Sequence, residues 1–220
     1  MRYSILSRTI SIQDLEIKCR QAGALNIKPR PLMKQVFCDL DPSAAEKLSR
    51  THGIKVSPVK AVKSSQTLAP AVSALGEGLN LHDTYSELHQ AYTPRLDGTG
   101  LTVALLDSGV RTTHEALVGK IILEENFSEA PTVGDIFGHG TNNAYIIAGE
   151  YNGRSGVAPG AKIMSMKALN NNGEGTDEMV VDAIERVCEL VQAAIDEGLP
   201  LTDEMYPNTI SISLGSEDDG

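Results

Sequence analysis

A long amphipathic segment over residues 176–197 restricts the possible folds of this chain more than any other part of the sequence. Its apolar side chains recur every three or four positions, which places them on one face of an α-helix; they are Val180, Ala183, Ile184, Val187, Leu190, Val191, Ala194 and Ile195. Asp177 and Glu178 lie in the first turn, where the helix dipole favours negative charge. Gly198 follows the last periodic residues and predicts the end of the helix. A helix with this single apolar face requires a large apolar surface to pack against.

Short apolar runs before and after this segment predict the surface that it covers. Residues 101–106 form a continuous run rich in apolar residues, which is typical of a strand buried in a parallel sheet. Residues 121–123, 163–167 and 210–214 are shorter runs of the same kind. Strands that alternate with helices predict an α/β fold over residues 97–220, with a parallel sheet and helices on its faces.

Residues 1–63 have a different pattern and predict a small α+β unit. Three strands and one further extended stretch are expected, near residues 2–9, 32–40 and 54–62 and before Pro31. Two helices are expected, one capped by Ser11 and the other capped by Asp41, with Pro42 in its first turn. The resulting order, β-α-β-β-α-β, is that of a ferredoxin-like fold.

Residues 64–96 connect the two units. The polar stretch 64–67 and the Ala69-Pro70 pair are typical of an exposed linker, and residues 85–92 predict a short helix. We therefore divide the chain into a first unit over 1–63, a linker over 64–96 that includes the start of the second unit, and the α/β unit described above.

Charge and composition exclude several classes of function. The formal net charge is −10, and an acidic protein repels nucleic acid and anionic membranes, so neither is an expected partner. No apolar run reaches the roughly 20 residues that a membrane-spanning helix needs. The first residues turn polar too early for a secretory signal, and the three cysteines lack metal-ligand spacing. We expect a cytoplasmic protein with reduced cysteines; a secreted protein whose signal has been removed is the alternative.

Three short segments combine residue types that perform chemistry. Residues 102–110 form a strand that ends at Asp107, which places a carboxylate at the sheet edge where α/β sites form. Gly138-His139-Gly140-Thr141 places a histidine between two glycines at the start of an expected helix, where backbone and substrate can approach it closely. Residues 210–215 form a strand that ends in glycine, and Gly156-Val157-Ala158-Pro159 lies between the second and third segments.

In their order, spacing and residue types, these segments resemble those of the subtilase family of serine proteases, over more than half of the chain. The resemblance implies a subtilisin-like α/β fold and acyl transfer by a Ser-His-Asp triad. Asp107 matches the family's catalytic Asp and His139 matches its catalytic His. Asp107 would accept the Nδ1 proton of the imidazole, and His139 would carry a proton from the nucleophile to the leaving amine.

The resemblance also implies a peptide or protein substrate. The strand that lines the family's specificity pocket is matched by Ser213, Leu214 and Gly215. Together with Gly173 and Gly175 of a glycine-rich stretch, it would pair with an extended peptide from both sides.

Two further implications concern the rest of the protein. Residues 1–63 resemble, in element order, the prodomain that assists folding of subtilases and then blocks their cleft, so the chain would be a zymogen.

No cofactor is expected. Many subtilases bind calcium, and Asp83 and Asp135 are possible ligands, but no oxygen-ligand spacing supports a site.

The chain departs from the family pattern in two places. The family's nucleophile segment, G-T-S-x-x-x-P, and its oxyanion Asn lie C-terminal of the matched strand, and no serine among these 220 residues has that context. We therefore expect the chain alone to be inactive, and to need a C-terminal fragment that carries the nucleophile, or self-association, to complete its packing. After G-H-G-T the family usually has His-Val-Ala-Gly, whereas this chain has Asn142-Asn143-Ala144-Tyr145. Tyr145 is expected to place a large side chain where the catalytic helix packs tightly.

These features leave two functions open. An endopeptidase is favoured, because a decayed site has no reason to keep both Asp107 and His139. The alternative is a catalytically silent relative that binds peptides or partners in assembly or inhibition, which Tyr145 and the lack of the nucleophile segment favour.

Overall fold

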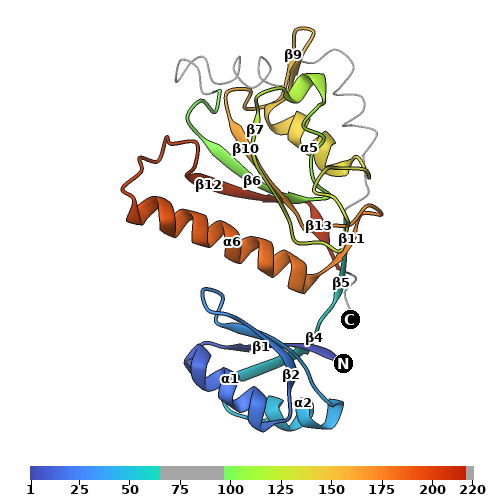
Figure 1. Cartoon of the computed structure of the whole chain (residues 1–220), viewed down its shortest axis with the longest axis vertical. Helices are drawn as coiled ribbons and strands as arrows, with labels where there is room; N and C mark the ends of the chain where they lie inside the picture. The colour runs from blue at the N-terminus through green and yellow to red at the C-terminus, as the bar shows by residue number, and fades with distance from the viewer. Residues whose placement is uncertain (65–96, 217–220) are drawn as a thin grey trace.

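The computed structural model describes residues 1–64 and 97–216, which form two units joined side by side (Figure 1). The predicted helix over 85–92 and nearly all of the predicted linker lie outside the described residues. Within the described residues, no helix is both long enough and apolar enough to cross a membrane.

The N-terminal unit has the β-α-β-β-α-β order that the sequence predicts. Its elements are β1 (Arg2–Ser7), α1 (Ile12–Gln21), β2 (Leu25–Arg30), β3 (Gln35–Asp39), α2 (Pro42–Ser49) and β4 (Ile54–Pro58). The strands form an antiparallel sheet in the order β2-β3-β1-β4, and both helices cover one face of it (Figure 1). Ser11 and Asp41 cap the two helices as expected, accepting hydrogen bonds from the backbone N–H groups of Asp14 and Ser43.

The second unit is built on a parallel sheet in the order β12-β6-β10-β7. Its strands are β6 (Thr102–Asp107), β7 (Ile121–Asn126), β10 (Lys162–Lys167) and β12 (Pro207–Ile212). The register sets Asp107 opposite Lys167, so an acidic and a basic residue end two adjacent central strands. The α/β fold that the sequence predicts is therefore confirmed.

Helices cover both faces of this sheet (Figure 1). Helix α6 (Asp177–Asp196), capped by Thr176, packs its apolar face on one side and encloses a core that includes Leu106, Met166 and Ala183. Helix α5 (His139–Ala148) and the short 3-10 helix η1 (Glu115–Leu117) cover the other side. A small hairpin, β8 (Glu150–Tyr151) and β9 (Arg154–Ser155), follows α5.

The strand that was predicted over 54–62 is in fact two strands, and the second belongs to a different sheet. β4 ends at Pro58, which pairs with Tyr3 near the start of β1. β5 (Ala61–Ser64) then leaves the first unit and lies between β11 (Glu174–Thr176) and β13 (Leu214–Gly215), antiparallel to both. The end of the N-terminal unit is thus inserted into the second unit.

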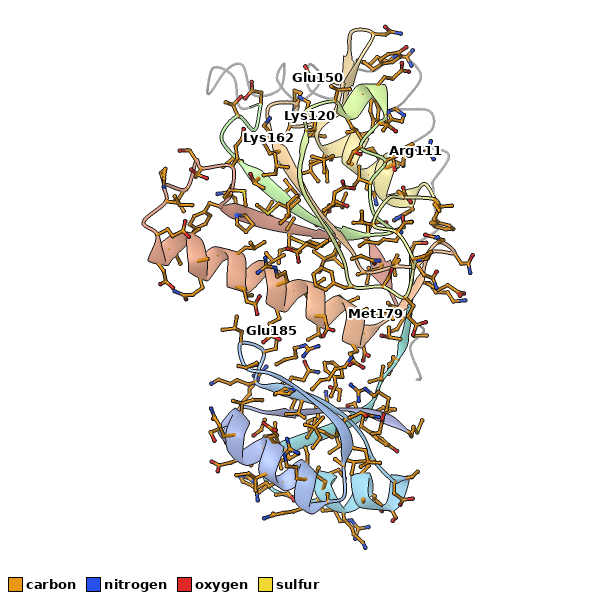
Figure 2. The ribbon with its side chains drawn as sticks, in the orientation of Figure 1. Arg111, Lys120, Glu150, Lys162, Met179 and Glu185 are labelled. Carbon is orange, nitrogen blue, oxygen red and sulfur yellow. The ribbon has the colours of Figure 1, made fainter. Side chains whose placement is uncertain are left out.

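Charged contacts fasten the N-terminal unit to α6. Arg2 bonds to Glu178 through two nitrogens, at 2.8 and 2.6 Å. Arg30 pairs with Asp182 at 2.5 Å, and the backbone N–H of Leu32 donates to Glu185 at 3.0 Å. Glu185 lies on the side of α6 that faces the first unit (Figure 2). The α6 helix is therefore shared: its apolar face covers the parallel sheet and its acidic face holds the N-terminal unit.

Candidate active site

The side chains of Asp107 and His139 meet at the end of the parallel sheet. His139 Nδ1 lies 2.7 Å from Asp107 Oδ1. The carboxylate is almost entirely buried, and the imidazole retains 12% of its side-chain exposure. Since a carboxylate oxygen only accepts, the Nδ1 atom carries the proton, and Nε2 is the basic nitrogen of the neutral ring. The sequence-based pairing of these two residues thus has the geometry of an oriented general base.

Two donors besides His139 hold the Asp107 carboxylate. The backbone N–H of Ser108 donates to Oδ1 at 2.7 Å, and Nδ2 of Asn143 donates to Oδ2 at 2.9 Å. Both oxygens of this buried carboxylate are therefore hydrogen-bonded, as burial of a charged group requires. Asn143 was not among the residues predicted for the site; the departure of the sequence from His-Val-Ala-Gly at this position was the available signal.

The helix that carries His139 packs directly on the loop that follows Asp107. Gly140 is buried, and a Cβ added to it would collide with the backbone oxygen of Gly109 and approach the Asp107 side chain to 3.1 Å. Only glycine permits this approach. The expected close approach of neighbouring backbone is found at Gly140, whereas the approach of a substrate to His139 stays a prediction.

Asp135, considered from sequence as a calcium ligand, ties these two segments together. Its Oδ1 accepts from Ser108 Oγ at 2.9 Å and from the backbone N–H of Gly138 at 2.8 Å. Its Oδ2 accepts from both the N–H and the hydroxyl of Thr141, at 2.9 and 2.5 Å. The Asp135 carboxylate thus anchors the start of α5 to the loop after β6. Among the described residues, no three His, Cys, Asp or Glu side chains are grouped to hold a metal ion.

Lys167 places a buried cation beneath these carboxylates. Its Nζ donates to the backbone oxygens of Ser108 and Gly134, the latter at 3.2 Å, and the side chain is fully buried. Burial lowers the pKa of Lys167 below its ordinary value, although the charges of Asp135 and Asp107 act in the opposite direction. The lysine therefore provides positive charge to a site that holds two buried acids.

Four of the five residues predicted to bind substrate line the two sides of β5. In β11, Gly175 pairs with Val62, and the oxygen of nearby Gly173 accepts from the N–H of Ser64 at 3.0 Å. In β13, Leu214 pairs with Ser64 and Gly215 with Lys63, whereas Ser213 lies between β12 and β13. We call the space between β11 and β13 the strand channel. Here it holds a segment of the same chain.

Alternate side chains of β5 face into the second unit. Val62 and Ser64 are each only 6% exposed, whereas Ala61 and Lys63 are exposed. This alternation is that of a strand with one buried face. The strand channel thus accepts backbone on both edges and a side chain at every second residue.

The strand channel borders the loop that carries His139. Gly173 has a φ of +75°, and a Cβ there would lie 2.6 Å from the ring of Phe137, two residues before the histidine. The backbone N–H groups of Ala168 and Leu169, which lead into this turn, donate to the backbone oxygen of Asp107 at 2.9 and 3.1 Å. The wall of the strand channel at Gly173 is therefore connected to the segments that carry Asp107 and His139.

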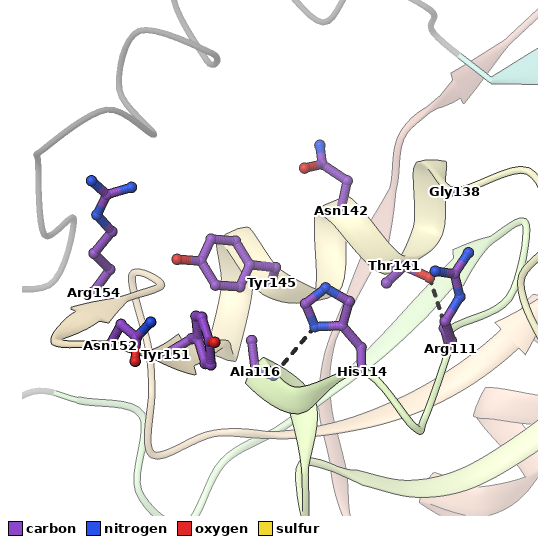
Figure 3. A pocket seen from close by; sticks show the side chains of 10 residues that line it. All are labelled: Arg111, His114, Ala116, Gly138, Thr141, Asn142, Tyr145, Tyr151, Asn152 and Arg154. Carbon is purple, nitrogen blue, oxygen red and sulfur yellow. Dashed lines mark hydrogen bonds between the residues drawn. The ribbon is translucent and has the colours of Figure 1, made fainter.

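The expected tight packing of Tyr145 is found at the end of α5, where a Cβ added to Gly149 would lie 2.3 Å from the tyrosine ring. Its ring is half-buried and lines an open pocket of about 700 Å³, together with Tyr151, Arg154 and Arg111 (Figure 3). His114 also lines this pocket, and its Nδ1 accepts from the N–H of Ala116 at 3.2 Å, which caps η1. The tyrosine therefore leaves the packing at Asp107 and His139 undisturbed.

Comparisons with known proteins found a matching family and similar folds. The model of the subtilase family matches residues 98–220. Among curated proteins, the thermophilic serine proteinase of Bacillus sp. (strain AK1) is 30% identical over 69% of this chain and 43% of its own length. Thermitase of Thermoactinomyces vulgaris is 36% identical over 54% of this chain and 39% of its own length. The chain thus spans less than half the length of these relatives.

One solved structure extends the likeness of fold to both units. Fervidolysin from Fervidobacterium pennivorans, described as a keratinolytic enzyme related to subtilisin, aligns with 97% of this chain and 35% of its own, with a TM-score of 0.62. Its sequence identity is 20%, so this likeness concerns the fold alone.

Proposed function

This chain belongs to the subtilase family, and on that basis we propose that its protein is a serine endopeptidase in which Asp107 and His139 are two members of a catalytic triad. The observation that carries the proposal is the 2.7 Å contact between His139 Nδ1 and Asp107 Oδ1. In this role Nε2 of His139 takes the proton of a serine nucleophile and returns it to the leaving amine. Asp107 holds the His139 ring in the tautomer with the proton on Nδ1, and it stabilises the imidazolium that exists between the two proton transfers.

We propose that the strand channel is the substrate site. Peptide recognition by strand addition uses main-chain hydrogen bonds for affinity and alternate side-chain pockets for selectivity. β5 uses both, because its backbone pairs with β11 and β13 while Val62 and Ser64 are buried. A substrate peptide would replace β5 in the same direction.

The N-terminal unit would then act as an inhibitory prodomain, and the chain as part of a zymogen. Its globular part is held on α6 by Arg2 and Arg30, and its last strand fills the channel. A competing peptide has to displace β5 while the globular part stays attached. Attachment of this kind raises the effective concentration of the blocking strand.

The nucleophile has to be supplied by sequence other than these 220 residues, because no serine here has the G-T-S-x-x-x-P context. The chain alone is proposed to be inactive. A partner segment that carries the serine would pair with β12, which is one of the two edge strands of the described parallel sheet and exposes Ile210 and Ile212. A cytoplasmic location stays a prediction, supported by three cysteines that are all free.

A serine-directed fluorophosphonate reagent tests this proposal. The complete protein, defined as this chain together with the segment that supplies the serine, is expected to become labelled on one serine. Labelling should be lost in His139→Ala, because the serine is no longer activated. Equal labelling of the variant would refute the assignment of His139.

The second candidate function is a catalytically silent binding module, because the strand channel holds a peptide segment by strand pairing alone. It predicts no labelled serine in the complete protein, together with binding of an Ala-Val-Lys-Ser peptide that competes with β5. A labelled serine would exclude this candidate.

A further inference from the structure

Asn143 stands one helical turn after His139 and contacts the same carboxylate. Residues four apart lie on the same face of an α-helix, so both side chains project from α5 toward the end of β6. His139 reaches Oδ1 of Asp107 at 2.7 Å and Asn143 reaches Oδ2 at 2.9 Å. Each oxygen therefore has its own donor from α5.

The chemistry of the three groups determines which atoms face each other. A carboxylate accepts only, so the amide group must present its nitrogen, and not its oxygen, to Asp107. Asn143 Nδ2 and His139 Nδ1 lie 3.4 Å apart, and both nitrogens donate a hydrogen bond to Asp107. Asn143 and His139 thus share one acceptor and do not bond to each other.

We propose that Asn143 is a positioning residue for the Asp107–His139 pair: its amide fixes the rotation of the carboxylate and takes up part of its negative charge. This inference rests on the proposed function. The family usually has valine at this position, and a valine side chain cannot donate a hydrogen bond. The amide is therefore a feature of this chain that the resemblance does not account for.

Two other charged groups act on the same carboxylate from neighbouring elements. Lys167 comes from β10, and its charge is coupled to both Asp107 and Asp135. Asp135 comes from the loop before α5 and is linked to Asp107 through Ser108, whose N–H bonds Asp107 and whose hydroxyl bonds Asp135. Both groups remain in place when Asn143 is changed, so a change at Asn143 isolates the amide.

Nuclear magnetic resonance of the His139 ring nitrogens, followed against pH in this 220-residue chain, tests the inference without any proteolytic activity. In Asn143→Leu the shape is nearly kept and the donor is lost, so Asp107 exerts its full charge on the imidazolium. We expect the titration midpoint of His139 to rise by about half a pH unit to one unit. Asn142→Leu is the matched control, because Asn142 lines the pocket beside Tyr145, and its midpoint should match the wild type.

A second variant at the same position keeps the test valid if Asn143→Leu fails to fold. Asn143→Val introduces the residue usual in the family and should raise the midpoint in the same direction. An unchanged midpoint in the variants that keep the wild-type amide spectrum would overturn the inference, and so would an equal rise in Asn142→Leu.

Asp107→Asn separates this inference from the proposed function. It should lower the His139 midpoint, since the anionic partner is removed. If Asp107→Asn has no effect, the pair itself is wrong. If Asp107→Asn lowers the midpoint while the changes at Asn143 do nothing, only the role of Asn143 fails.

Discussion

Arg2 and Glu178 form a two-point ion pair between the first strand of the N-terminal unit and the first turn of α6, across 176 residues of sequence. The two side chains are 21% and 12% exposed, so solvent screens the pair only in part. β5 follows the same unit along the chain into the strand channel. Breaking the Arg2–Glu178 pair should therefore weaken the binding of β5 in the channel, and loss of β5 from the channel should weaken the pair.

Arg2→Ala should weaken the attachment of the N-terminal unit by about 1–3 kcal/mol, because it leaves Glu178 partly buried without its main cation. Hydrogen exchange at the Ser64 amide, which donates to Gly173, reports whether β5 stays in the channel. We expect exchange there to become roughly tenfold faster or more. Glu46→Ala, which breaks the exposed Arg50–Glu46 pair on α2, is the control and should leave Ser64 unchanged.

The same pair should make stability depend on pH. Burial favours the neutral form of Glu178, but the hydrogen bonds and charges of Arg2 and Lys28 outweigh it and hold the pKa below its ordinary value of 4.5. A carboxylate with a lowered folded pKa stabilises the fold above its unfolded pKa, and this contribution is lost as the pH falls through the folded value.

Urea unfolding between pH 3 and 6 measures this effect as the difference between wild type and Glu178→Gln. The advantage of the wild type should be full above about pH 4.5 and shrink below it. Glu185 contributes with the opposite sign in both proteins, since burial raises its pKa despite the Leu32 N–H and Arg30, and it cancels in the difference. A difference that is constant over the whole range would contradict the linkage.

Lys167→Met should be strongly destabilising, by about 3–5 kcal/mol, because it leaves the buried Asp107 and Asp135 without their neighbouring cation. Lys162→Met, at the other end of β10 and partly exposed, is the matched control and should change stability by less than about 1 kcal/mol. The free energy of unfolding in urea measures both. Equal effects of the two changes would show that Lys167 has no special electrostatic role.

Gly173→Ala should destabilise the wall of the strand channel by about 1–3 kcal/mol. Its φ of +75° disfavours any side chain, and the new methyl group would press on Phe137. Gly153→Ala has a φ of +76° but open space around it, so it reports the backbone strain alone. Thermal unfolding should show the larger loss for Gly173→Ala; a loss no greater than that of Gly153→Ala would mean that the contact with Phe137 does not matter.

Local patterns predicted the elements of the second unit well. The helix expected over 176–197 spans Asp177–Asp196, because its apolar periodicity and its caps agree with each other. Asp107 and His139 could be paired because their motifs resemble, in order and spacing, those of the subtilase family. The hairpin of β8 and β9 was overlooked although Asn152-Gly153, a frequent hairpin turn, signalled it.

What the sequence did not predict depends on contacts between distant residues. Nothing local to Ala61–Ser64 indicates that this strand leaves its own sheet for two strands more than 100 residues away. The burial of Lys167 was equally hidden, because lysine at a strand end normally reaches solvent. Asn143 was noticed only as a departure from a pattern, since its partner Asp107 lies 36 residues earlier.

The rate of peptide hydrolysis should be compared between the complete protein and its Asp107→Asn and His139→Ala variants. If the two side chains form the acid–base pair of a serine endopeptidase, Asp107→Asn should lower kcat/KM by about 10⁴-fold, and His139→Ala by at least as much. Hydrolysis by either variant at a rate near that of the wild type would contradict the assignment.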